Sequence, residues 1–478
     1  MDLFTDPIIQ KAFDFANLSL AGQKRLSGEN VIDHCKRVEK ILWDLDVRDP
    51  ITLSTAILHH AILDGAATSE DIKKEFGEEI VVMLETIDKL QVIKLNENSE
   101  LDFSEQLRKM FLVLAKDLRI VLIKLADIAD NLTTLKYLKP EKRKEVAEET
   151  LEIFAPLCDR LGMGELRGQM QDLAFENLYP KEYLWLKGYI TNDLENLGKD
   201  LLKIKAELIT VLKEKKIDAE IQSRIKHTYS LYTKLLRPEI DKDLKKVKDL
   251  IALRIIVNTE EECYKSLDIV QNLYKILPDL DAVSDYIVHP KPNGYRSIHI
   301  KVYGPNNLPF EIQIRTRQMH EEAEYGLAAH WNYAEKKESG LSDEKISQGF
   351  ATSAEKLEWV KSLGQWQKEI SDNQEFLKTV KTDFFGTRIY CFTPKGDVKD
   401  LPDGATPIDF AYRVHTDLGN RITGVKVNGK VVALDSKLKN GNVVEILLSK
   451  DLKKKPSRDW LQFVVTGLAR RQIKRAFN

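Results

Sequence analysis

The pattern of apolar positions along the chain predicts regions of different secondary structure. Up to about residue 175, apolar residues recur about every three or four positions, as Val31, Cys35 and Val38 do, and few stretches alternate as strands do. This predicts an all-α domain over residues 1–180. A charged helix continues from about 185, and residues 250–257 then form an apolar β-type run, while 297–303 and 310–315 alternate. We therefore expect a mixed α/β domain over 185–335.

The remaining chain is expected to hold a connector, a small domain and a basic ending. Residues 336–384 are polar with an apolar stripe at Leu357, Leu363 and Trp366, which predicts a helical connector. Residues 385–450 contain strand candidates at 388–392, 424–427 and 443–448, a helix at 407–414, and turns at 394–397 and 428–429. Residues 451–478 begin a basic helical region without a capping signal at its end, so we expect the natural fold to continue beyond Asn478. The expected fold class is multidomain, α and α+β.

Composition narrows the possible partners and the compartment. Charged residues make up 31% of the chain but the net charge is only −2, so any contact with nucleic acid must be local. The first seven residues lack the basic start of a secretion signal, and no apolar run approaches the about 18 residues of a membrane span, so a cytoplasmic protein without membrane contact is expected. The cysteines at 35, 158, 263 and 391 are far apart, as buried thiols in a reducing compartment are.

The two alternating strands carry the strongest chemical pattern. The turn at 304–307 would join them as a hairpin, with Ile298, Ile300 and Val302 on the same face as Phe310, Ile312 and Ile314. The pattern leaves open whether the other face is a binding site or an ordinary solvated surface. That face carries His299, Lys301, Glu311, Gln313 and Arg315.

Three further patterns near this hairpin suit nucleotide binding. The segment Lys291-Pro292-Asn293-Gly294-Tyr295 places a cation, an amide and an aromatic ring in a constrained loop, which can hold a phosphate and stack on a base.

The second pattern is basic. Arg224, Lys226, Ser230 and Lys234 follow one another at spacings of two, four and four, and can line one face of a helix start with phosphate donors. A solvated helix face is the commoner meaning of such spacing.

The third pattern is a pair of carboxylates. Asp249 precedes the apolar run and Glu311 lies on the polar hairpin face, and two carboxylates from separate elements are what a Mg²⁺ ion bridging nucleotide phosphates requires. The alternative is a strand-end aspartate and a salt-bridged glutamate.

Four segments in this order resemble the synthetase domain of the long RelA/SpoT homologues, the stringent-response (p)ppGpp synthetases and hydrolases. The segments are RIKHTYSLYTK, DLIALRIIV, DYIVHPKPNGYRSIH and FEIQIRTRQMHEEAEYGLAAHW. The resemblance implies a nucleotidyltransferase-like fold that transfers pyrophosphate from ATP to the 3′ hydroxyl of GTP or GDP and releases AMP.

The same resemblance implies roles for individual residues. Arg224 and Arg254 would enclose the ATP adenine, with Lys226, Ser230 and Lys234 on its phosphates. Asp249 and Glu311 would hold Mg²⁺, with Glu311 also the base for the acceptor hydroxyl. Tyr295 would stack on guanine, with Lys291, Asn293, His299 and Gln313 positioning the acceptor. The family's basic RxKD or acidic ExDD pattern reads Ala282-Val283-Ser284-Asp285 here, so the choice between GTP and GDP and the metal dependence stay open.

The N-terminal region resembles the family's HD-type manganese hydrolase domain. SGENVIDHCKRV, ILHHAILDGAATSEDI and VLIKLADIADNLTTL carry the likeness and put His34, His59 and Asp127 on ligand positions. The HD pair reads His59-His60, and the acidic pair that follows reads Leu63-Asp64. Without a carboxylate at Leu63 to activate water, we predict absent or very weak hydrolysis.

Metal binding by this altered site stays open. The family's Asp-Arg-Leu-His-Asn run reads Asp127-Ile128-Ala129-Asp130-Asn131, and imidazole can still bind Mn²⁺. The degenerate site would comprise His34, His59, His60, Asp64 and Asp127. Plain helix-core histidines are the alternative.

The third unit resembles the family's TGS domain, a small β-grasp module. FTPKGDV, LPDGATPIDFAYRVHTDLGNR and VNGKVV carry this likeness, which implies contact with the ribosome and uncharged tRNA. Asn420 stands where the family often has histidine, whereas His415 is retained. The basic ending after Lys450 either meets ribosomal RNA phosphates or is a solvated helix.

Two other functions remain open at this point. One is a bifunctional enzyme that also hydrolyses (p)ppGpp with Mn²⁺. The other is a catalytically silent sensor of ribosomes or nucleotides.

Overall fold

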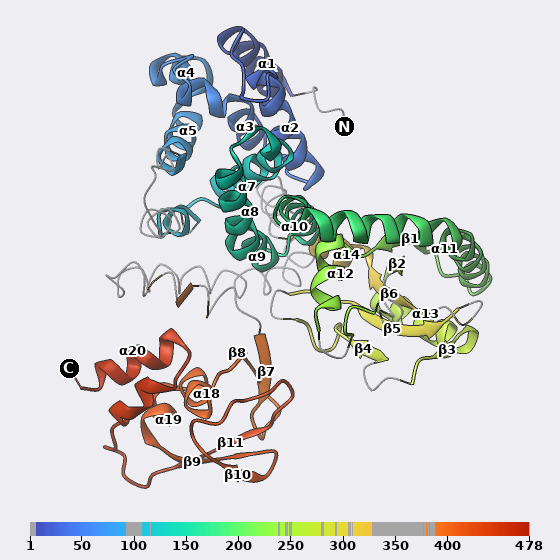
Figure 1. The fold of residues 1–478 in the computed structure, drawn as a ribbon, viewed down its shortest axis with the longest axis vertical. Helices are drawn as coiled ribbons and strands as arrows, with labels where there is room; N and C mark the ends of the chain where they lie inside the picture. Colours follow the sequence, from blue (N-terminus) through green and yellow to red (C-terminus); the bar gives the residue numbers. More distant parts are fainter. Residues whose placement is uncertain are drawn as a thin grey trace. The chain divides into compact units, whose positions relative to one another are not determined.

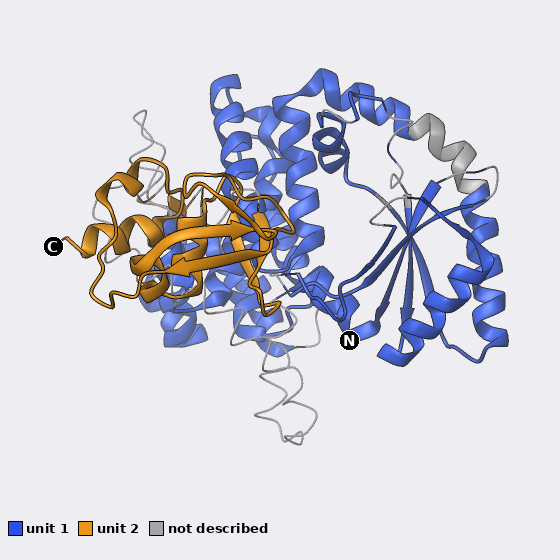
Figure 2. Cartoon of the chain, turned by 90° about the horizontal axis from the view of Figure 1, so that it is seen from below, with its two compact units in different colours: residues 1–94, 109–364 blue, residues 95–108, 365–478 orange. Residues whose placement is uncertain are grey.

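The chain forms two compact units, which Figure 2 distinguishes by colour: residues 1–94 with 109–364, and residues 95–108 with 365–478. The computed structural model describes residues 6–91, 108–114, 116–237, 240–243, 247, 251–278, 282–291, 294–304, 307, 309–326, 376, 379–380, 382 and 388–477. The expected connector, with its stripe at Leu357, Leu363 and Trp366, lies outside these residues apart from 376, 379–380 and 382. Within the described residues, no helix has the length and apolar character needed to cross a bilayer.

The first part of unit 1 is all-helical, which confirms the expected helical domain. Its central helix is α3, which is buried on nearly all sides and contacts α1, α2, α5 and α7. Asp49 starts α3 by accepting hydrogen bonds from the backbone N–H groups of Ile51 and Thr52. The helices are α1 (Pro7–Ser19), α2 (Val31–Asp44), α3 (Pro50–Leu63), α4 (Ser69–Phe76), α5 (Glu78–Gln91), α7 (Leu118–Thr133), η1 (Leu135–Tyr137), α8 (Pro140–Glu149), the π-helix η2 (Thr150–Phe154), α9 (Ala155–Arg160) and α10 (Gly164–Leu178).

The second part of unit 1 is a mixed sheet with helices, as predicted. Helix α11 (Pro180–Glu214) leads into it, and its strands follow the order β1-β2-β6-β5-β3, with β4 also paired to β5. Strands β2 and β6 are parallel and the other pairs are antiparallel. The elements are β1 (Glu220–Ile225), α12 (Thr228–Leu235), β2 (Ile251–Val257), α13 (Glu260–Leu273), β3 (Lys275–Ile276), β4 (Val283–Asp285), β5 (Ile298–Tyr303), β6 (Pro309–Thr316) and α14 (Arg317–Tyr325).

Helices α11 and α13 cover one face of this sheet, and α11 runs along it in Figure 1. The core there includes Leu208 of α11, Val270 of α13 and Ile255 of β2. The apolar residues of the predicted hairpin join the same core, from Ile298 to Val302 on β5 and from Phe310 to Ile314 on β6. The hairpin and its sorting into two faces are therefore confirmed, and the polar face is left on the opposite side.

Unit 2 has two small sheets, β10-β9-β11 and β7-β8, joined by a bridge between Phe392 and Val443. The Asn428-Gly429 turn is confirmed between β9 and β10, with both residues at positive φ, which suits a two-residue hairpin. The structure adds β8, β10 and α19 to the elements that the pattern predicted. The elements are β7 (Arg388–Phe392), β8 (Val398–Pro402), α18 (Pro407–Val414), α19 (Thr416–Arg421), β9 (Ile422–Val427), β10 (Lys430–Val432), β11 (Val444–Leu448), η6 (Arg458–Gln462) and α20 (Gly467–Arg475).

The basic ending packs onto α18 of the same unit. Ile473 of α20 and Trp460 of η6 join an apolar cluster with Ile408 of α18. The buried Asp409 of α18 accepts hydrogen bonds from the backbone N–H and the hydroxyl of Thr466, which begins α20. Arg470 donates to the carbonyls of Leu461 and Val464. Part of the basic character of this segment therefore stabilises the fold.

The four cysteines behave as the sequence indicated. Cys35, Cys158, Cys263 and Cys391 are all buried and free. Burial raises the pKa of each thiol, to about 12 for Cys35 and about 11 for Cys391. They are therefore core residues without thiolate chemistry.

Candidate functional sites

The face of the sheet opposite the α11 core carries aligned polar side chains. Glu311 and Gln313 are each 9% exposed and Arg315 is fully buried, so the alternative of an ordinary solvated face is wrong. Burying this many polar groups is costly unless they are paired or hold a ligand. Two rows of paired residues cross the face: Arg224, Ala252, Glu311 and Lys301 in one, and Gln222, Arg254, Gln313 and His299 in the other.

Glu311 lies at the centre of a hydrogen-bonded series on this face. Its carboxylate accepts a hydrogen bond of 2.7 Å from Nε2 of Gln313 and lies 3.2 Å from Nδ1 of His299. Nε2 of His299 is in turn 2.7 Å from the hydroxyl of Tyr295. Burial raises the pKa of Tyr295, so its hydroxyl stays protonated and donates. These contacts hold Glu311 in one position before any ligand arrives.

Two arginines share one carboxylate beside this series. The carboxylate of Glu324 on α14 lies 2.9 Å from Nη2 of Arg254 and 3.3 Å from Nη2 of Arg315. Burial, together with the charge of Arg315, lowers the pKa of Arg254 to about 10, which leaves the guanidinium charged at neutral pH. Arg254, Arg315 and Glu324 together therefore carry a net positive charge inside the protein, and this charge favours an anionic ligand.

A pocket of ≈ 140 Å³ opens on this face. Ala252 forms part of its wall and stands between Arg224 and Glu311 in the row, so the small side chain leaves space between a cation and a carboxylate. Cations and hydrogen-bond donors around a buried acid suit the phosphates of a metal-bound nucleotide. The lining residues are Arg167, Arg224, Lys226, His227, Ser230, Ala252, Glu311 and Gln313.

The structure brings most of the predicted nucleotide-binding residues to this region, though not on one helix. Ser230 and Lys234 lie on α12, but Arg224 lies on β1 and Lys226 follows that strand. The expectation of a single helix face was therefore wrong, because α12 begins only at Thr228, after the cap His227. Lys234 does not line the pocket. Asp249 and Asn293 lie outside the described residues.

The expected base-stacking segment holds a cation between aromatic rings. Nζ of Lys291 lies 4.5 Å from the ring centroid of Tyr286 and 4.9 Å from that of Tyr295. The backbone N–H of Lys291 also bonds to the carbonyl of Tyr295, so this loop is closed on itself. Tyr286 was not predicted, although it adjoins the Asp285 that the sequence singled out.

Residues 282–285, which depart from the family's RxKD or ExDD pattern, have a structural role. Asp285 at the end of β4 accepts hydrogen bonds from the backbone N–H groups of Ile287 and Val288 and from the hydroxyl of Tyr264. Ala282 is buried, and Ser284 pairs with His299 of β5. This segment therefore fixes the backbone beside the histidine that contacts Glu311.

Helix α10 of the helical part supports the pocket, which the sequence did not predict. Asp172 accepts a hydrogen bond of 2.9 Å from Nδ1 of His227 and one of 2.8 Å from the backbone N–H of Tyr229. A Cβ at Gly168 would lie only 2.1 Å from the His227 ring, so a glycine is needed for this close approach. Arg167 on the same helix lines the pocket and pairs with Asp159.

The pairing of His227 with Asp172 predicts that the stability of the protein depends on pH. Burial opposes a charge on His227, but hydrogen bonds to Asp172 and Glu165 outweigh it and raise its pKa to about 9. The stabilisation is therefore complete below the ordinary pKa of about 6.5 and is lost as the pH rises through 9. We expect Asp172→Asn, which keeps an acceptor for Tyr229, to remove about 2 kcal/mol at pH 6.5 but little at pH 9.5.

Urea denaturation of both proteins across this pH range measures the effect. Asp218→Asn, an exposed aspartate of the same unit, serves as the control. Parallel pH profiles for the wild type and Asp172→Asn would contradict the assignment.

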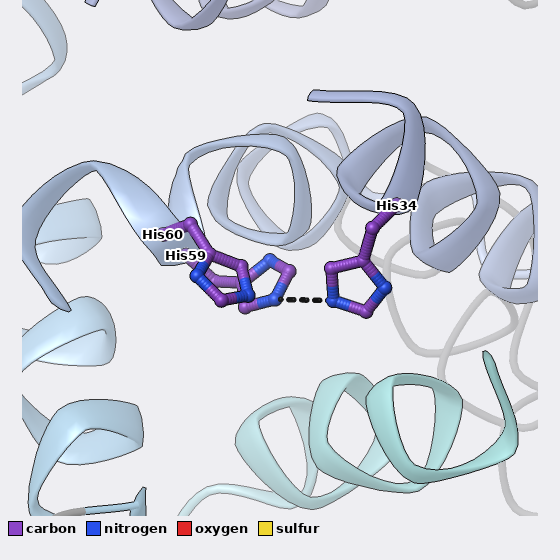
Figure 3. A group of neighbouring side chains, drawn as sticks. All are labelled: His34, His59 and His60. Carbon is purple, nitrogen blue, oxygen red and sulfur yellow. Dashed lines mark hydrogen bonds between the residues drawn. The ribbon is translucent and has the colours of Figure 1, made fainter. Parts of the chain in front are cut away.

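A second site lies in the helical part, where three histidines converge (Figure 3). His34 comes from α2, and His59 and His60 come from α3. Their ligand atoms all lie within 4.8 Å of one another, and Nε2 of His34 is 3.2 Å from Nε2 of His59. Oδ1 of Asp127 on α7 lies 3.4 Å from Nε2 of His34.

The surroundings suit a metal ion. Burial and the neighbouring His60 hold the pKa of His59 well below its usual range, so that ring stays neutral, as a metal ligand must be. Asp127 is held by Lys124 and Asn131, at 2.7 Å each. Asp64 lies 2.8 Å from His60 and holds that ring. The alternative of plain apolar-core histidines does not fit this cluster.

Comparisons with known proteins agree with this domain order. Residues 12–164 match the HD domain, residues 223–338 match the region found in RelA / SpoT proteins, and residues 389–448 match the TGS domain. Fold and pocket thus define a multidomain protein with a helical HD domain, a mixed-sheet RelA/SpoT region and a β-grasp TGS domain, which confirms the expected fold class.

Similar curated proteins extend over almost the whole chain. The GTP pyrophosphokinase of Myxococcus xanthus is 39% identical over 98% of this chain and 60% of its own length. The bifunctional (p)ppGpp synthase/hydrolase RelA of Mycobacterium tuberculosis is 39% identical over 98% of this chain and 62% of its own length. The bifunctional (p)ppGpp synthase/hydrolase SpoT of Escherichia coli is 38% identical over 98% of this chain and 64% of its own length. The chain is similar to these RelA/SpoT proteins over almost its whole length and spans under two thirds of theirs.

A solved structure shows only a weak likeness. The small alarmone synthetase 2 of Bacillus subtilis is 24% identical, covers 38% of this chain and 98% of its own, and has a TM-score of 0.26. The HD match and the histidine cluster together indicate use of a divalent metal without distinguishing Mg²⁺ from Mn²⁺.

Proposed function

We propose that this protein is a GTP diphosphokinase that transfers pyrophosphate from ATP to the 3′ hydroxyl of GTP or GDP and releases AMP. The observation that carries the proposal is a buried carboxylate, Glu311, which hydrogen bonds fix in a pocket lined by Arg224, Lys226 and Ser230. The match to the region found in RelA / SpoT proteins and the similarity to a GTP pyrophosphokinase support the same conclusion.

The arrangement suits catalysis by positioning and charge neutralisation. Arg224 and Arg254 would enclose the ATP adenine, with Lys226, Ser230 and Lys234 on its phosphates. Glu311 would accept the proton of the acceptor hydroxyl. Asp249 and Glu311 would hold Mg²⁺, which neutralises phosphate charge when bound. On the acceptor side, Tyr295 would stack on the guanine base, with Lys291, Asn293, His299 and Gln313 around it.

An assay of purified protein with ATP, Mg²⁺ and either GDP or GTP tests this function. Chromatography should show ppGpp or pppGpp together with an equal amount of AMP, and a chelator should abolish both products. The ratio of rates with GDP and GTP determines the acceptor preference. Absence of both products, with the protein folded, would favour a catalytically silent sensor.

We also propose that hydrolysis of (p)ppGpp is absent or very weak. Leu63 on α3 offers no group that could activate water, and Asp64 is engaged by His60. Incubation with labelled ppGpp and Mn²⁺ measures this activity. Rapid release of pyrophosphate would show a bifunctional enzyme instead.

For the TGS domain we propose contact with uncharged tRNA and the ribosome. His415 begins α19 and accepts a hydrogen bond from the backbone N–H of Asp417, while Asn420 accepts one from the hydroxyl of Tyr412. Asn420 is thus engaged in the fold, and the basic surface of 451–478 is the better candidate for RNA phosphates.

A further inference from the structure

Helix α10 of the helical part places one arginine in the wall of the nucleotide pocket. Arg167 lines this pocket together with Lys226 and Glu311, although it lies upstream of residues 223–338, which match the RelA/SpoT region. Its side chain is 32% exposed, so a ligand in the pocket can reach it. The wall of the pocket is therefore built from two domains.

The backbone that carries Arg167 is fixed against the synthetase region on both sides of this residue. Helix α10 contacts α12 and α14 (Figure 1). Near its start, a Cβ at Gly164 would lie only 2.9 Å from the carbonyl oxygen of Ala323 on α14, so these two helices touch. Further along, Asp172 accepts a hydrogen bond from the backbone N–H of Tyr229 in the first turn of α12. Arg167 lies between these two contacts, so packing sets its position relative to the pocket.

The guanidinium of Arg167 has donors left for a ligand. Its Nη1 pairs with Asp159 of α9, and its Nε is buried without a hydrogen-bond partner among the described residues. A guanidinium has five N–H groups, and the contact with Asp159 uses only part of them. A buried donor without a partner is costly, and a phosphate is the acceptor that suits the planar guanidinium best.

Arg167 also lies near the proposed residues of both substrates. It shares the pocket wall with Lys226 and Ser230, which are proposed to bind the ATP phosphates. Burial lowers the pKa of Lys291, a proposed acceptor residue, and the positive charges of Arg167 and Lys226 add to this effect. Arg167 is thus placed to contact the group that passes from one substrate to the other.

We propose that Arg167 is a catalytic residue of the synthetase, supplied by the helical part, which binds the pyrophosphate group during its transfer. In this step the 3′ oxygen of the acceptor forms a bond to the β-phosphorus of ATP, and its proton passes to Glu311. The bond from that phosphorus to the oxygen shared with the α-phosphate breaks, and AMP leaves with this oxygen. A fixed guanidinium that contacts two oxygens of the transferred group stabilises their charge. The inference rests on the proposed function.

Steady-state kinetics of the full chain with ATP, GDP and Mg²⁺ test the proposal. Arg167→Ala should lower kcat about 100-fold, which is the effect of removing one fixed donor to a reacting group. The affinity for a non-hydrolysable ATP analogue should change much less, because the contact is strongest during transfer. Arg167→Lys, which keeps the charge, should recover part of the rate. Guanidinium ion, added well below denaturing concentrations, should partly restore Arg167→Ala but not Glu311→Gln.

A control and the alternative outcomes separate this role from others. Arg317→Ala on α14, which removes an exposed arginine of the same unit, should keep the wild-type rate. No ppGpp from the folded wild type would overturn the proposed function and this inference with it. An active wild type with Arg167→Ala above about a third of its rate would overturn the role of Arg167 alone. A lower rate that neither Arg167→Lys nor guanidinium restores would assign Arg167 a structural role and also overturn the proposal.

Discussion

Glu311→Gln is expected to lower the rate of pyrophosphate transfer by about 10³-fold. The amide has the same shape and keeps its contacts with Gln313 and His299, so the pocket should retain its geometry. It has no negative charge, however, and can neither accept the proton of the acceptor hydroxyl nor bind Mg²⁺ strongly. The measurement is the initial rate of AMP and ppGpp formation with saturating ATP and GDP.

The control for this experiment is Glu261→Gln on α13, which removes an exposed carboxylate from the same domain. This variant should retain the wild-type rate. Thermal unfolding temperatures of all three proteins should agree closely. A Glu311→Gln protein that keeps more than about a tenth of the wild-type rate would show that another group is the base.

The second large effect is on stability. Glu324→Gln should lower the free energy of unfolding by about 3 kcal/mol, because it leaves Arg254 and Arg315 buried together without a countercharge. Burial already lowers the pKa of Arg254, which shows that the protein surroundings disfavour its charge. Urea denaturation monitored by circular dichroism at neutral pH measures this loss in the free energy of unfolding.

Glu261→Gln again provides the exposed control, with an expected change below about 0.5 kcal/mol. If the surplus positive charge at Arg254 and Arg315 is used to hold an anion, a high phosphate concentration should restore part of the lost stability of Glu324→Gln. A loss below about 1 kcal/mol would mean that the arginines have other adequate partners.

Local patterns predicted those elements whose folding depends on neighbours in the sequence. The strand at 388–392 and the helix at 407–414 have the predicted bounds, because alternation, a Thr406–Asp409 capping box and Pro407 at the helix start all act within a few residues. The sorting of the β5–β6 hairpin into two faces follows from the period of a strand in the same way.

The composition of the pocket depended on contacts that spacing cannot reveal. Arg224, Lys226 and Ser230 suggested one helix face, yet they come from a strand, a connection and a helix. Arg167 and Asp172 come from α10, which precedes the synthetase region in the chain. Long-range packing places Arg167 in the pocket wall and Asp172 against His227 of that wall. The types of these two residues gave no indication of these positions.

By itself, the sequence determined the order of the three domains, the two faces of the central hairpin and the chemical character of both candidate sites. Tertiary structure alone decided that the polar face is buried and that Nε2 of His34 meets Nε2 of His59. The reason is physical: periodicity reports which side of an element avoids water, whereas burial and donor distances depend on how separate elements pack.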